Sequence, residues 1–320
     1  GEYVKVAGTE IRSVEQMTDA LDLHFKAILD AVGPLPAGAR RLRVALDACN
    51  GAGVFIAPRL LEALGVDVVP INVTPNGLFP RPAEPIPENL GALCETVRAH
   101  DCDIGFAQDM DADRLAVVSD RGVPIGEDFT LVLAAWYVLG KQPGPVVANL
   151  STTAALDEVA RRFNCQVLRT KIGEANVTER MQSERAVIGG EGNGGVIYPA
   201  INFARDSQVG MALILHLLAS SGKTVSGLVA ELPPFVMVKE KLTCPSNRIP
   251  DVLRMVKREF AHLPMDTRDG VKVMLPTGWF HVRGSNTEPI VRVVAEGASE
   301  AEARGVVKDV FDRVAAIVNS

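Results

Sequence analysis

Short apolar segments alternate with amphipathic segments along the first part of the chain, and this alternation most restricts how the chain can fold. Strands are expected at residues 41–47, 66–72 and 102–107, with helices between them. Consecutive strands joined by helices form parallel sheets with helical crossovers. A further helix is expected at 13–32, with Ser13 as its N-cap, because its apolar residues recur every three or four positions. The first part is therefore predicted to be an α/β unit.

The same order repeats with different residues and then changes near the end. Further strands are expected at 145–150, 166–171 and 186–191, again with helices between and after them. The Pro-Pro-Phe stretch at 233–235 marks a boundary, and the segment beyond it reads as strand, helix, several strands and a final helix. We therefore predict two successive mixed-sheet α/β domains followed by a C-terminal α+β domain. The expected domains are residues 1–122, 123–234 and 235–320.

The composition is that of an ordinary globular protein, with 47% hydrophobic and 22% charged residues. The formal net charge of −6 argues against binding to nucleic acid, because nucleic-acid-binding domains are usually basic. Five cysteines occur without a CxxC pair, as expected of thiols in a reducing compartment. The N-terminus has no apolar signal region, and no apolar run is long enough to span a bilayer. These features predict a cytoplasmic protein that binds neither nucleic acid nor membrane.

Three aspartates occupy alternate positions in the stretch AQDMDADR, at Asp109, Asp111 and Asp113. At a spacing of about 4 Å and an effective dielectric constant of about 20, each pair of like charges costs on the order of 4 kcal/mol. A divalent cation removes that cost, and Mg²⁺ and Ca²⁺ prefer oxygen ligands. The loop follows an expected strand, and open α/β sheets bind ligands at the carboxyl ends of their strands. The spacing is compatible with a metal site and with a solvated acidic turn.

Two other motifs account for this loop less well. An EF-hand needs Gly at its sixth position and Glu at its twelfth, where this chain has Arg114 and Asp120. An aspartyl phosphatase of the DxD type would use Asp109 as its nucleophile, but it leaves Asp113 and Arg114 without a role. The EF-hand is therefore a poor fit, and the phosphatase stays open.

Three further loops carry groups that suit either a phosphate or sugar hydroxyls. NGAG at 50–53 lies at a strand-to-helix turn and is either a phosphate site or a purely structural turn. GGEGNGG at 189–195 sets Glu191 and Asn193 among glycines, where a carboxylate and an amide suit sugar hydroxyls; a flexible turn is the alternative. RGSNTEP at 283–289 gathers Arg, Ser, Asn and Thr donors that suit a phosphate, with a polar hairpin loop as the alternative.

Three of these stretches, DMDADR, GEGNGG and RGSNTEP, occur in an order and at distances that resemble the α-D-phosphohexomutase superfamily. That family includes phosphomannomutase, phosphoglucomutase and phosphoglucosamine mutase. Lesser features also match, namely DACNGAG, the stretch at 126–128, TKIGE at 170–174 and the Arg-Asp pair at 205–206. The resemblance runs from about residue 13 to the end and covers the second, third and fourth of the family's four domains.

The resemblance implies a role for each matching residue. A Mg²⁺ ion would be held by Asp109, Asp111 and Asp113, and the transferred phosphoryl group would lie beside Arg114. Sugar hydroxyls would be held by Lys171, Glu191 and Asn193. The phosphate that does not react would be bound by Arg283, Ser285, Asn286, Thr287 and Arg292. The implied activity is phosphoryl transfer between the 1 and 6 positions of a hexose phosphate, through a hexose bisphosphate; mannose, glucose and glucosamine phosphates all stay open.

The family's first domain carries a phosphoserine in a loop like TASHNP, and no serine among these 320 residues is followed by histidine. We therefore expect the chain alone to lack turnover. Three interpretations stay open: a phosphohexomutase represented by its last three domains, a sugar-phosphate-binding regulatory module, and a subunit completed by a separate serine-bearing chain. The retained aspartates favour the first and the third, because a sensor has no need of three metal carboxylates.

Met110 and Asn286 are among the positions that depart from the family's usual pattern, and Gly192 and Asn193 differ from its bacterial Met/Gln–Ser pair but are closer to its GEENGG form. Met110 stands where a glycine is usual, and a positive φ would strain a methionine. Asn286 replaces a frequent glycine, and asparagine tolerates a left-handed φ better than most residues. The backbone φ at these positions therefore decides whether the loops can adopt the family's geometry.

Overall fold

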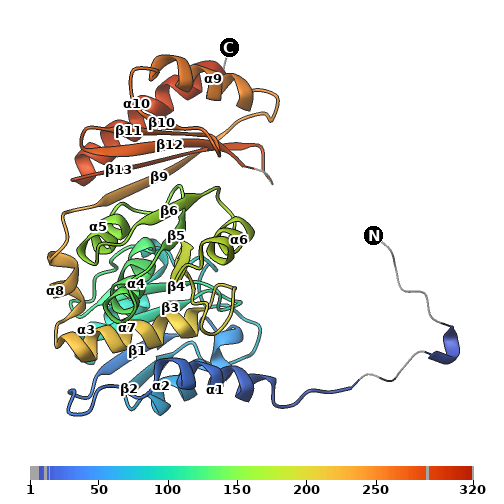
Figure 1. The fold of residues 1–320 in the computed structure, drawn as a ribbon, viewed down its shortest axis with the longest axis vertical. Coiled ribbons are helices and arrows are strands. Elements are labelled where there is room, and N and C mark those ends of the chain that lie inside the picture. The colour runs from blue at the N-terminus through green and yellow to red at the C-terminus, as the bar shows by residue number, and fades with distance from the viewer. Residues whose placement is uncertain (1–6, 11–12, 14, 286–287, 319–320) are drawn as a thin grey trace.

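Three β-sheets are stacked along the long axis of the molecule in the computed structural model, which describes residues 7–10, 13, 15–285 and 288–318 (Figure 1). We call them sheets A, B and C in chain order. Sheets A and B are mixed sheets with helical crossovers, and sheet C is antiparallel with helices on one side. The predicted fold class is therefore confirmed.

Sheet A has the spatial order β2 (Asp67–Ile71), β1 (Arg43–Asp47), β3 (Ile104–Gln108) and β4 (Leu115–Ser119). Strand β1 pairs in parallel with β2 and β3, and β4 returns antiparallel to β3. Parallel neighbours need crossover connections, which are supplied by α2 (Ala57–Ala63) and α3 (Gly91–Ala99). Strands β3 and β4 are buried along their whole length, and β3 ends at Gln108, immediately before the acidic loop.

Sheet B repeats this plan with the order β6 (Val167–Thr170), β5 (Val146–Asn149), β7 (Ile188–Glu191) and β8 (Gly195–Ile197). Its crossovers are α5 (Ala155–Arg162) and α6 (Glu174–Glu184). Strand β8 is antiparallel to β7, and the glycine-rich loop joins them. The acidic loop and the glycine-rich loop thus occupy equivalent places, each at the carboxyl end of a central parallel strand.

Two long apolar helices, α4 (Asp128–Lys141) and α7 (Ser207–Ser221), pack on each other and on strands of both sheets A and B. Helix α7 is buried from Ser207 to Leu218, as expected of a helix that is apolar all round. One continuous hydrophobic core therefore joins sheets A and B. Helices α1 (Ala20–Val32) and α8 (Val225–Ala230) lie at the edge of this core.

Sheet C has the order β10 (Met265–Asp266), β11 (Val271–Leu275), β12 (Gly278–Gly284), β13 (Ile290–Gly297) and β9 (Val236–Thr243). Helices α9 (Ile249–Glu259) and α10 (Glu300–Val318) cover the face that points away from sheet B (Figure 1). Side chains from these helices and strands form a separate hydrophobic core. None of the helices within the described ranges has both the length and the apolar content needed to cross a bilayer.

The N-terminal helix is shorter than the sequence pattern predicts. Helix α1 begins at Ala20, with Asp19 and not Ser13 at the N-cap position. Met17, which precedes it, has no apolar surface to cover, since its side chain is 64% exposed, whereas Ile28 within the helix is fully buried. The prediction of a helix from residue 13 was therefore wrong, because an apolar face that recurs at helical spacing stabilises a helix only where that face is buried.

Short 3₁₀ helices form at η1 (Gly8–Glu10), η2 (Ala52–Phe55) and η3 (Pro87–Asn89).

Candidate functional site

The structure brings the three aspartates of the acidic loop together. Ligand oxygens of Asp109, Asp111 and Asp113 lie within 4.8 Å of one another. Asp109 is fully buried at the end of β3, Asp113 is half-buried and Asp111 is exposed. The cluster is therefore anchored in the protein on one side and open to solvent on the other.

The backbone of this loop answers the question raised by Met110. Met110 is not among the described residues with positive φ, whereas Ala112 has a φ of 61°. The loop therefore does not require a positive φ at Met110, and the condition for strain at that methionine is not met. The carbonyl of Met110 accepts a hydrogen bond from the backbone N–H of Ala52 at 2.8 Å, and a Cβ on Gly51 would lie 2.3 Å from that carbonyl oxygen. The NGAG glycine thus lets a neighbouring loop approach, which supports the structural reading of that motif.

The charge of the cluster is partly balanced by two arginines. Arg114 donates from its backbone N–H to Asp109 at 3.0 Å and from Nε to the same carboxylate at 2.6 Å. Arg205 forms an ion pair with Oδ2 of Asp113. The other oxygen, Asp113 Oδ1, is buried and accepts no hydrogen bond from any described residue. Burial and the neighbouring Asp109 raise the pKa of Asp113 to about 7. An all-oxygen donor set, in which Asp113 Oδ1 has no hydrogen bond from the described residues and only an ion-pair contact with Arg114 Nε at 3.5 Å, fits a hard divalent cation such as Mg²⁺.

Arg205 was not predicted as a site residue, although its Arg-Asp pair was noted as part of the resemblance. Besides Asp113, its guanidinium donates to Glu191 Oε2 at 3.0 Å and lies 3.4 Å from Glu174. Arg205 therefore joins the acidic loop of sheet A to the glycine-rich loop of sheet B. The local sequence signal was weak, because nothing near Arg205 in the chain indicates which carboxylates it meets.

The Glu191 carboxylate is almost fully buried and is held from three sides. Its Oε1 accepts hydrogen bonds from Asn149 Nδ2 and from the backbone N–H of Gly173, both at 2.9 Å, and its Oε2 accepts from Arg205. A carboxylate has about four acceptor sites. One acceptor site therefore remains on Glu191 for a ligand hydroxyl.

The glycine-rich loop is closely packed, which opposes the reading of a flexible turn. A Cβ on Gly192 would lie 2.1 Å from Asp128 Oδ1, and a Cβ on Gly194 would lie 2.3 Å from the Leu115 carbonyl oxygen. The carbonyl oxygen of Asn193's side chain accepts from Gly195 N at 3.2 Å. The amide nitrogen of that side chain has no partner among the described residues, so it is available as a donor.

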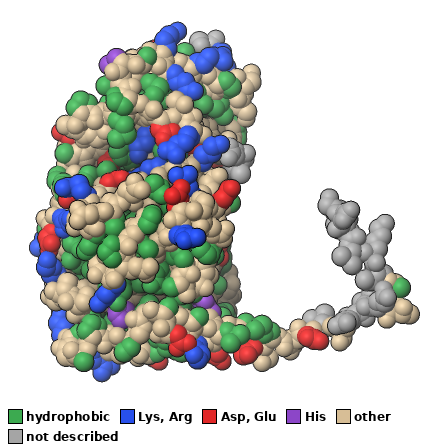
Figure 2. All heavy atoms as spheres, in the orientation of Figure 1, with side chains coloured by type: hydrophobic (Ala, Val, Ile, Leu, Met, Phe, Trp, Pro, Cys, Tyr) green, Lys and Arg blue, Asp and Glu red, His purple; other side chains and the backbone are tan. Residues whose placement is uncertain are grey.

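Lys171 lies on the surface, two residues from the Gly173 N–H that contacts Glu191. Its side chain lines a hollow of about 320 Å³ together with Arg169, Asn176, Arg180 and Arg268. Lys and Arg side chains gather at the junction between the uppermost sheet and the middle of the molecule (Figure 2). The structure thus places Lys171 beside the Glu191 loop, without a direct contact between the two side chains.

The phosphate-loop arginines stand opposite each other on neighbouring strands. Arg283 of β12 pairs in register with Arg292 of β13, so both side chains project from the same face of sheet C. Nε of Arg283 lies 3.8 Å from Asp269 Oδ1, and it is buried without a hydrogen bond to any described residue. Two guanidinium groups therefore flank the start and the end of the RGSNTEP loop.

The tip of that loop is only partly described. Ser285 donates from its backbone N–H to the Ile290 carbonyl at 2.9 Å, and its hydroxyl accepts from the backbone N–H of Glu288 at 3.3 Å. Asn286 and Thr287, predicted to bind phosphate, lie outside the described residues. The expectation about φ at Asn286 lies outside them as well.

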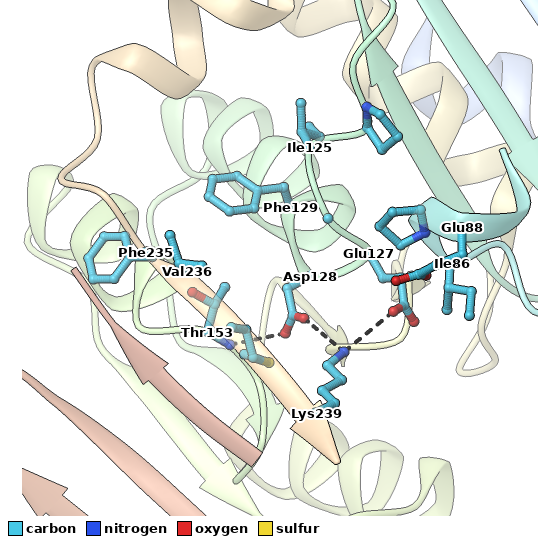
Figure 3. A pocket seen from close by; sticks show the side chains of 14 residues that line it. Ile86, Glu88, Ile125, Glu127, Asp128, Phe129, Thr153, Phe235, Val236 and Lys239 are labelled. Atoms are coloured by element: carbon cyan, nitrogen blue, oxygen red, sulfur yellow. Dashed lines mark hydrogen bonds and ion pairs between the residues drawn. The ribbon is translucent and has the colours of Figure 1, made fainter. Parts of the chain in front are cut away.

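A hollow of about 490 Å³ lies where segments of all three sheets meet, and the sequence did not indicate it. Lys239 of β9 reaches across this junction to Asp128 at 3.3 Å and to Glu127 at 3.5 Å (Figure 3). It also donates to the Gly192 carbonyl at 3.3 Å. Although burial opposes the charged ammonium, Asp128 and Glu127 raise the pKa of Lys239. Lys239 thereby links sheet C to the glycine-rich loop. The apolar part of the lining comes from Ile86, Ile125, Phe129, Phe235, Val236 and Met237.

Arg81 is a second arginine that sequence reasoning missed. It lies in the proline-rich loop, yet its side chain is only 8% exposed and pairs with Asp47 at 2.8 Å. It also donates to the carbonyl of Gln108, the residue before Asp109. The signal in the sequence that could have indicated Arg81 was the presence of a single arginine within a proline-rich stretch. Arg81 thereby fixes the proline-rich loop against the strand end that carries the acidic cluster.

The sequence of this chain matches a family of known proteins. Family models described as phosphoglucomutase/phosphomannomutase match at residues 22–122 for alpha/beta/alpha domain II, at 126–235 for alpha/beta/alpha domain III and at 237–313 for the C-terminal domain. The chain is 39% identical over 299 residues to a probable phosphoglucosamine mutase of Methanopyrus kandleri, covering 92% of this chain and 66% of that protein. It is 38% identical over 289 residues to a phosphoglucomutase/phosphomannomutase of Thermococcus kodakarensis, covering 89% of this chain and 63% of that protein.

A solved structure agrees with these relatives. A phosphoglucomutase/phosphomannomutase family protein from Burkholderia thailandensis matches with a TM-score of 0.79 at 31% identity, covering 92% of this chain and 63% of the other. This chain thus spans somewhat less than two thirds of each of these three proteins. Because the family models cover most of its length, the chain belongs to the phosphoglucomutase/phosphomannomutase family.

Proposed function

We propose that this chain carries the metal, sugar and phosphate sites of a phosphohexomutase, which moves a phosphoryl group between positions 1 and 6 of a hexose phosphate. The observation that carries the proposal is a chain of contacts between loops that are far apart in sequence. Arg205 joins Asp113 of the acidic loop to Glu191 of the glycine-rich loop. Asp269 then joins the segment beside Lys171 to Arg283 of the phosphate loop. The names of the relatives support the same activity.

Each loop contributes groups suited to one part of a hexose phosphate. When held by Asp109, Asp111 and Asp113, Mg²⁺ supplies charge neutralisation for a phosphoryl group. Arg114 is partly exposed and contacts Asp109 through Nε, while one of its terminal nitrogens lies 3.9 Å from Glu84. The terminal nitrogens are donors suited to phosphoryl oxygens. Sugar hydroxyls meet two donor groups, the ammonium of Lys171 and the side-chain amide of Asn193, and one acceptor site, on the carboxylate of Glu191.

The phosphate that does not react is assigned to the arginines at the two ends of the RGSNTEP loop. Arg283 and Arg292 are cross-strand neighbours, and a guanidinium can bind a phosphate through two parallel hydrogen bonds. The nearest carboxylates lie at 3.8 Å from Arg283 and at 3.4 Å from Arg292, so neither arginine is bound in a short bidentate pair. Ser285, Asn286 and Thr287 would add donors from the loop itself.

We further propose that the phosphoserine is supplied by a domain other than the three represented here, packed against the acidic loop. The surface beside Asp109–Asp113 exposes large apolar side chains that a globular protein usually covers. They belong to loops that contact each other near Met110. These side chains are Phe55, Leu78, Phe79 and Met110.

We propose domain boundaries at residues 122/123 and 234/235. The first coincides with the end of the matched range 22–122, and the second lies one residue before the end of the matched range 126–235. A cytoplasmic location is supported by the cysteines, which are free thiols and are mostly buried. Free thiols without disulfides are typical of a reducing compartment.

The test is conversion of a hexose 1-phosphate to its 6-phosphate, with a catalytic amount of hexose 1,6-bisphosphate present. It is run on the 320-residue chain with and without a separately expressed serine domain that is phosphorylated at its serine. We expect turnover only with both pieces, because a positioned nucleophile is needed and effective molarities of roughly 10⁵–10⁸ M depend on its placement. Robust turnover by the chain alone would reveal a nucleophile within it. Sugar-phosphate binding without turnover in either case would favour a regulatory module.

A further inference from the structure

Arg205 stands between a ligand of the proposed metal site and a ligand of the proposed sugar site. It pairs with Asp113 through one terminal nitrogen and donates to Glu191 at 3.0 Å through the other. We propose that Arg205 is a positioning residue that couples the two sites: it competes with the metal cation for Asp113 and orients Glu191 toward the sugar. This proposal rests on the proposed function, and it assigns a role to a residue outside the three ligand-binding motifs.

The guanidinium sets the distance between the two loops. Its three nitrogens lie in one rigid plane and face three carboxylates, those of Asp113, Glu191 and Glu174. The side chain is 19% exposed, so it is constrained by its surroundings. A Cβ on Gly195 would lie 2.3 Å from Arg205 Cδ, which explains why the last position of the glycine-rich loop is a glycine.

The backbone around Arg205 is fastened to the acidic loop as well. The Arg205 N–H donates to Glu174 at 2.8 Å, and Asp206 caps helix α7 by accepting from Gln208 N at 2.9 Å. The next residue, Ser207, donates its hydroxyl hydrogen to the Ala112 carbonyl at 2.6 Å. Arg205 therefore projects from a backbone that is held on both sides and is fastened to the acidic loop.

The electrostatic effect of Arg205 has opposite signs at the two sites. Next to Asp113, its positive charge repels a divalent cation and occupies an oxygen that the cation could use. Next to Glu191, it supplies a charge-assisted hydrogen bond that fixes the carboxylate while the fourth acceptor site stays open. Removing Arg205 should therefore favour the cation and disfavour the sugar. If Arg205 served only to stabilise the fold, its removal would weaken the binding of the cation and of the sugar together.

The experiment measures two affinities on the 320-residue chain by calorimetry. The probes are Mg²⁺ alone, and glucose, mannose and glucosamine 6-phosphates in the presence of Mg²⁺. For Arg205→Gln we expect the hexose phosphate bound by the wild type to bind roughly tenfold or more weakly, with Mg²⁺ affinity equal or higher. Arg205→Lys keeps the charge but cannot bridge two carboxylates, so hexose-phosphate binding should fall without any gain in Mg²⁺ affinity. Arg161→Gln, which removes a 75% exposed arginine paired with Glu158, is the matched control.

A double-mutant cycle tests whether Arg205 acts through Glu191. In the Glu191→Gln background, Arg205→Gln should cause little further loss of hexose-phosphate affinity, because the two residues form one unit. Additive losses, equal losses for both probes, or wild-type affinities in Arg205→Gln and Arg205→Lys would each overturn the proposed coupling. If the wild-type chain itself binds none of the three hexose phosphates, the proposed function fails and the coupling fails with it.

Discussion

The Asp269 carboxylate accepts a hydrogen bond from the backbone N–H of Ile172 at 2.9 Å, across the junction between sheets C and B. Ile172 follows Lys171 directly, and the other oxygen of Asp269 lies 3.8 Å from Arg283 Nε. The backbone carbonyl of Asp269 also contacts His281 Nε2 at 2.6 Å. One residue thereby fixes the start of the RGSNTEP loop relative to the segment beside Lys171.

Replacing Asp269 should loosen this junction. In Asp269→Ala the Ile172 N–H loses its acceptor, and a hydrogen bond of this kind contributes about 1 kcal/mol. We expect the free energy of unfolding, measured by urea titration, to fall by about that amount. Asp312→Ala removes a largely exposed aspartate of α10 and should leave stability nearly unchanged. Equal stability of both variants would show that the Asp269 contact does not hold the junction.

The acidic loop should bind Mg²⁺ through its carboxylates. Asp111 is the exposed member of the cluster, so Asp111→Asn removes a ligand with little effect on packing. We expect Mg²⁺ affinity, measured by calorimetry, to fall roughly tenfold or more. Asp101→Asn is a suitable control, because Asp101 has a φ of 48° that asparagine adopts readily. The metal assignment is contradicted if Asp111→Asn and the wild type bind Mg²⁺ equally.

The phosphate loop should depend on Arg283. In Arg283→Ala, hexose-phosphate binding should weaken by about 1.5–3 kcal/mol, the usual range for a charged hydrogen bond. Arg258→Ala serves as the control, since its side chain is 78% exposed on α9. Calorimetric titration with the same hexose phosphate measures both variants. An unchanged affinity in Arg283→Ala would assign that arginine to structure and not to binding.

His281 should make the protein less stable in mild acid. It is fully buried, with Nδ1 2.8 Å from the Ser151 hydroxyl, and burial lowers its pKa to about 4 from 6.5. Between these values the unfolded chain binds a proton that the folded chain does not, so stability falls as pH decreases. The loss from this one group reaches about 3 kcal/mol once the pH is below both values.

Removing His281 should flatten that pH dependence. In His281→Gln the free energy of unfolding should decrease less between about pH 7 and pH 4 than in the wild type, whatever its value at neutral pH. Urea titrations across this range provide the measurement. His262→Gln changes an exposed histidine and should follow the wild-type slope. Identical slopes in all three proteins would mean that His281 is not a buried neutral histidine.

Much of the architecture is determined by sequence patterns that are local. The alternation of apolar runs with helical segments predicted two mixed sheets and a C-terminal α+β part, because burial on a sheet or a helix face depends on near neighbours in the chain. The same is true of the acidic loop, since alternate aspartates directly after a strand meet wherever that strand lies. Local patterns mislead only where burial is missing, as before Ala20.

The connections between the loops were decided by the tertiary structure alone. Four residues contact a partner on a distant segment of the chain, and the sequence around each of them does not indicate which residue that partner is. They are Arg81, Arg205, Lys239 and Asp269. The acidic loop makes the same point, because its positive φ lies at Ala112 and not at Met110, and the Met110 carbonyl accepts a hydrogen bond from Ala52 of the NGAG turn. Such contacts depend on helical crossovers that bring the carboxyl ends of β3 and β7 to one side of a shared core. The sequence therefore determined which groups the site contains, and the packing of sheets A, B and C decided which of them meet.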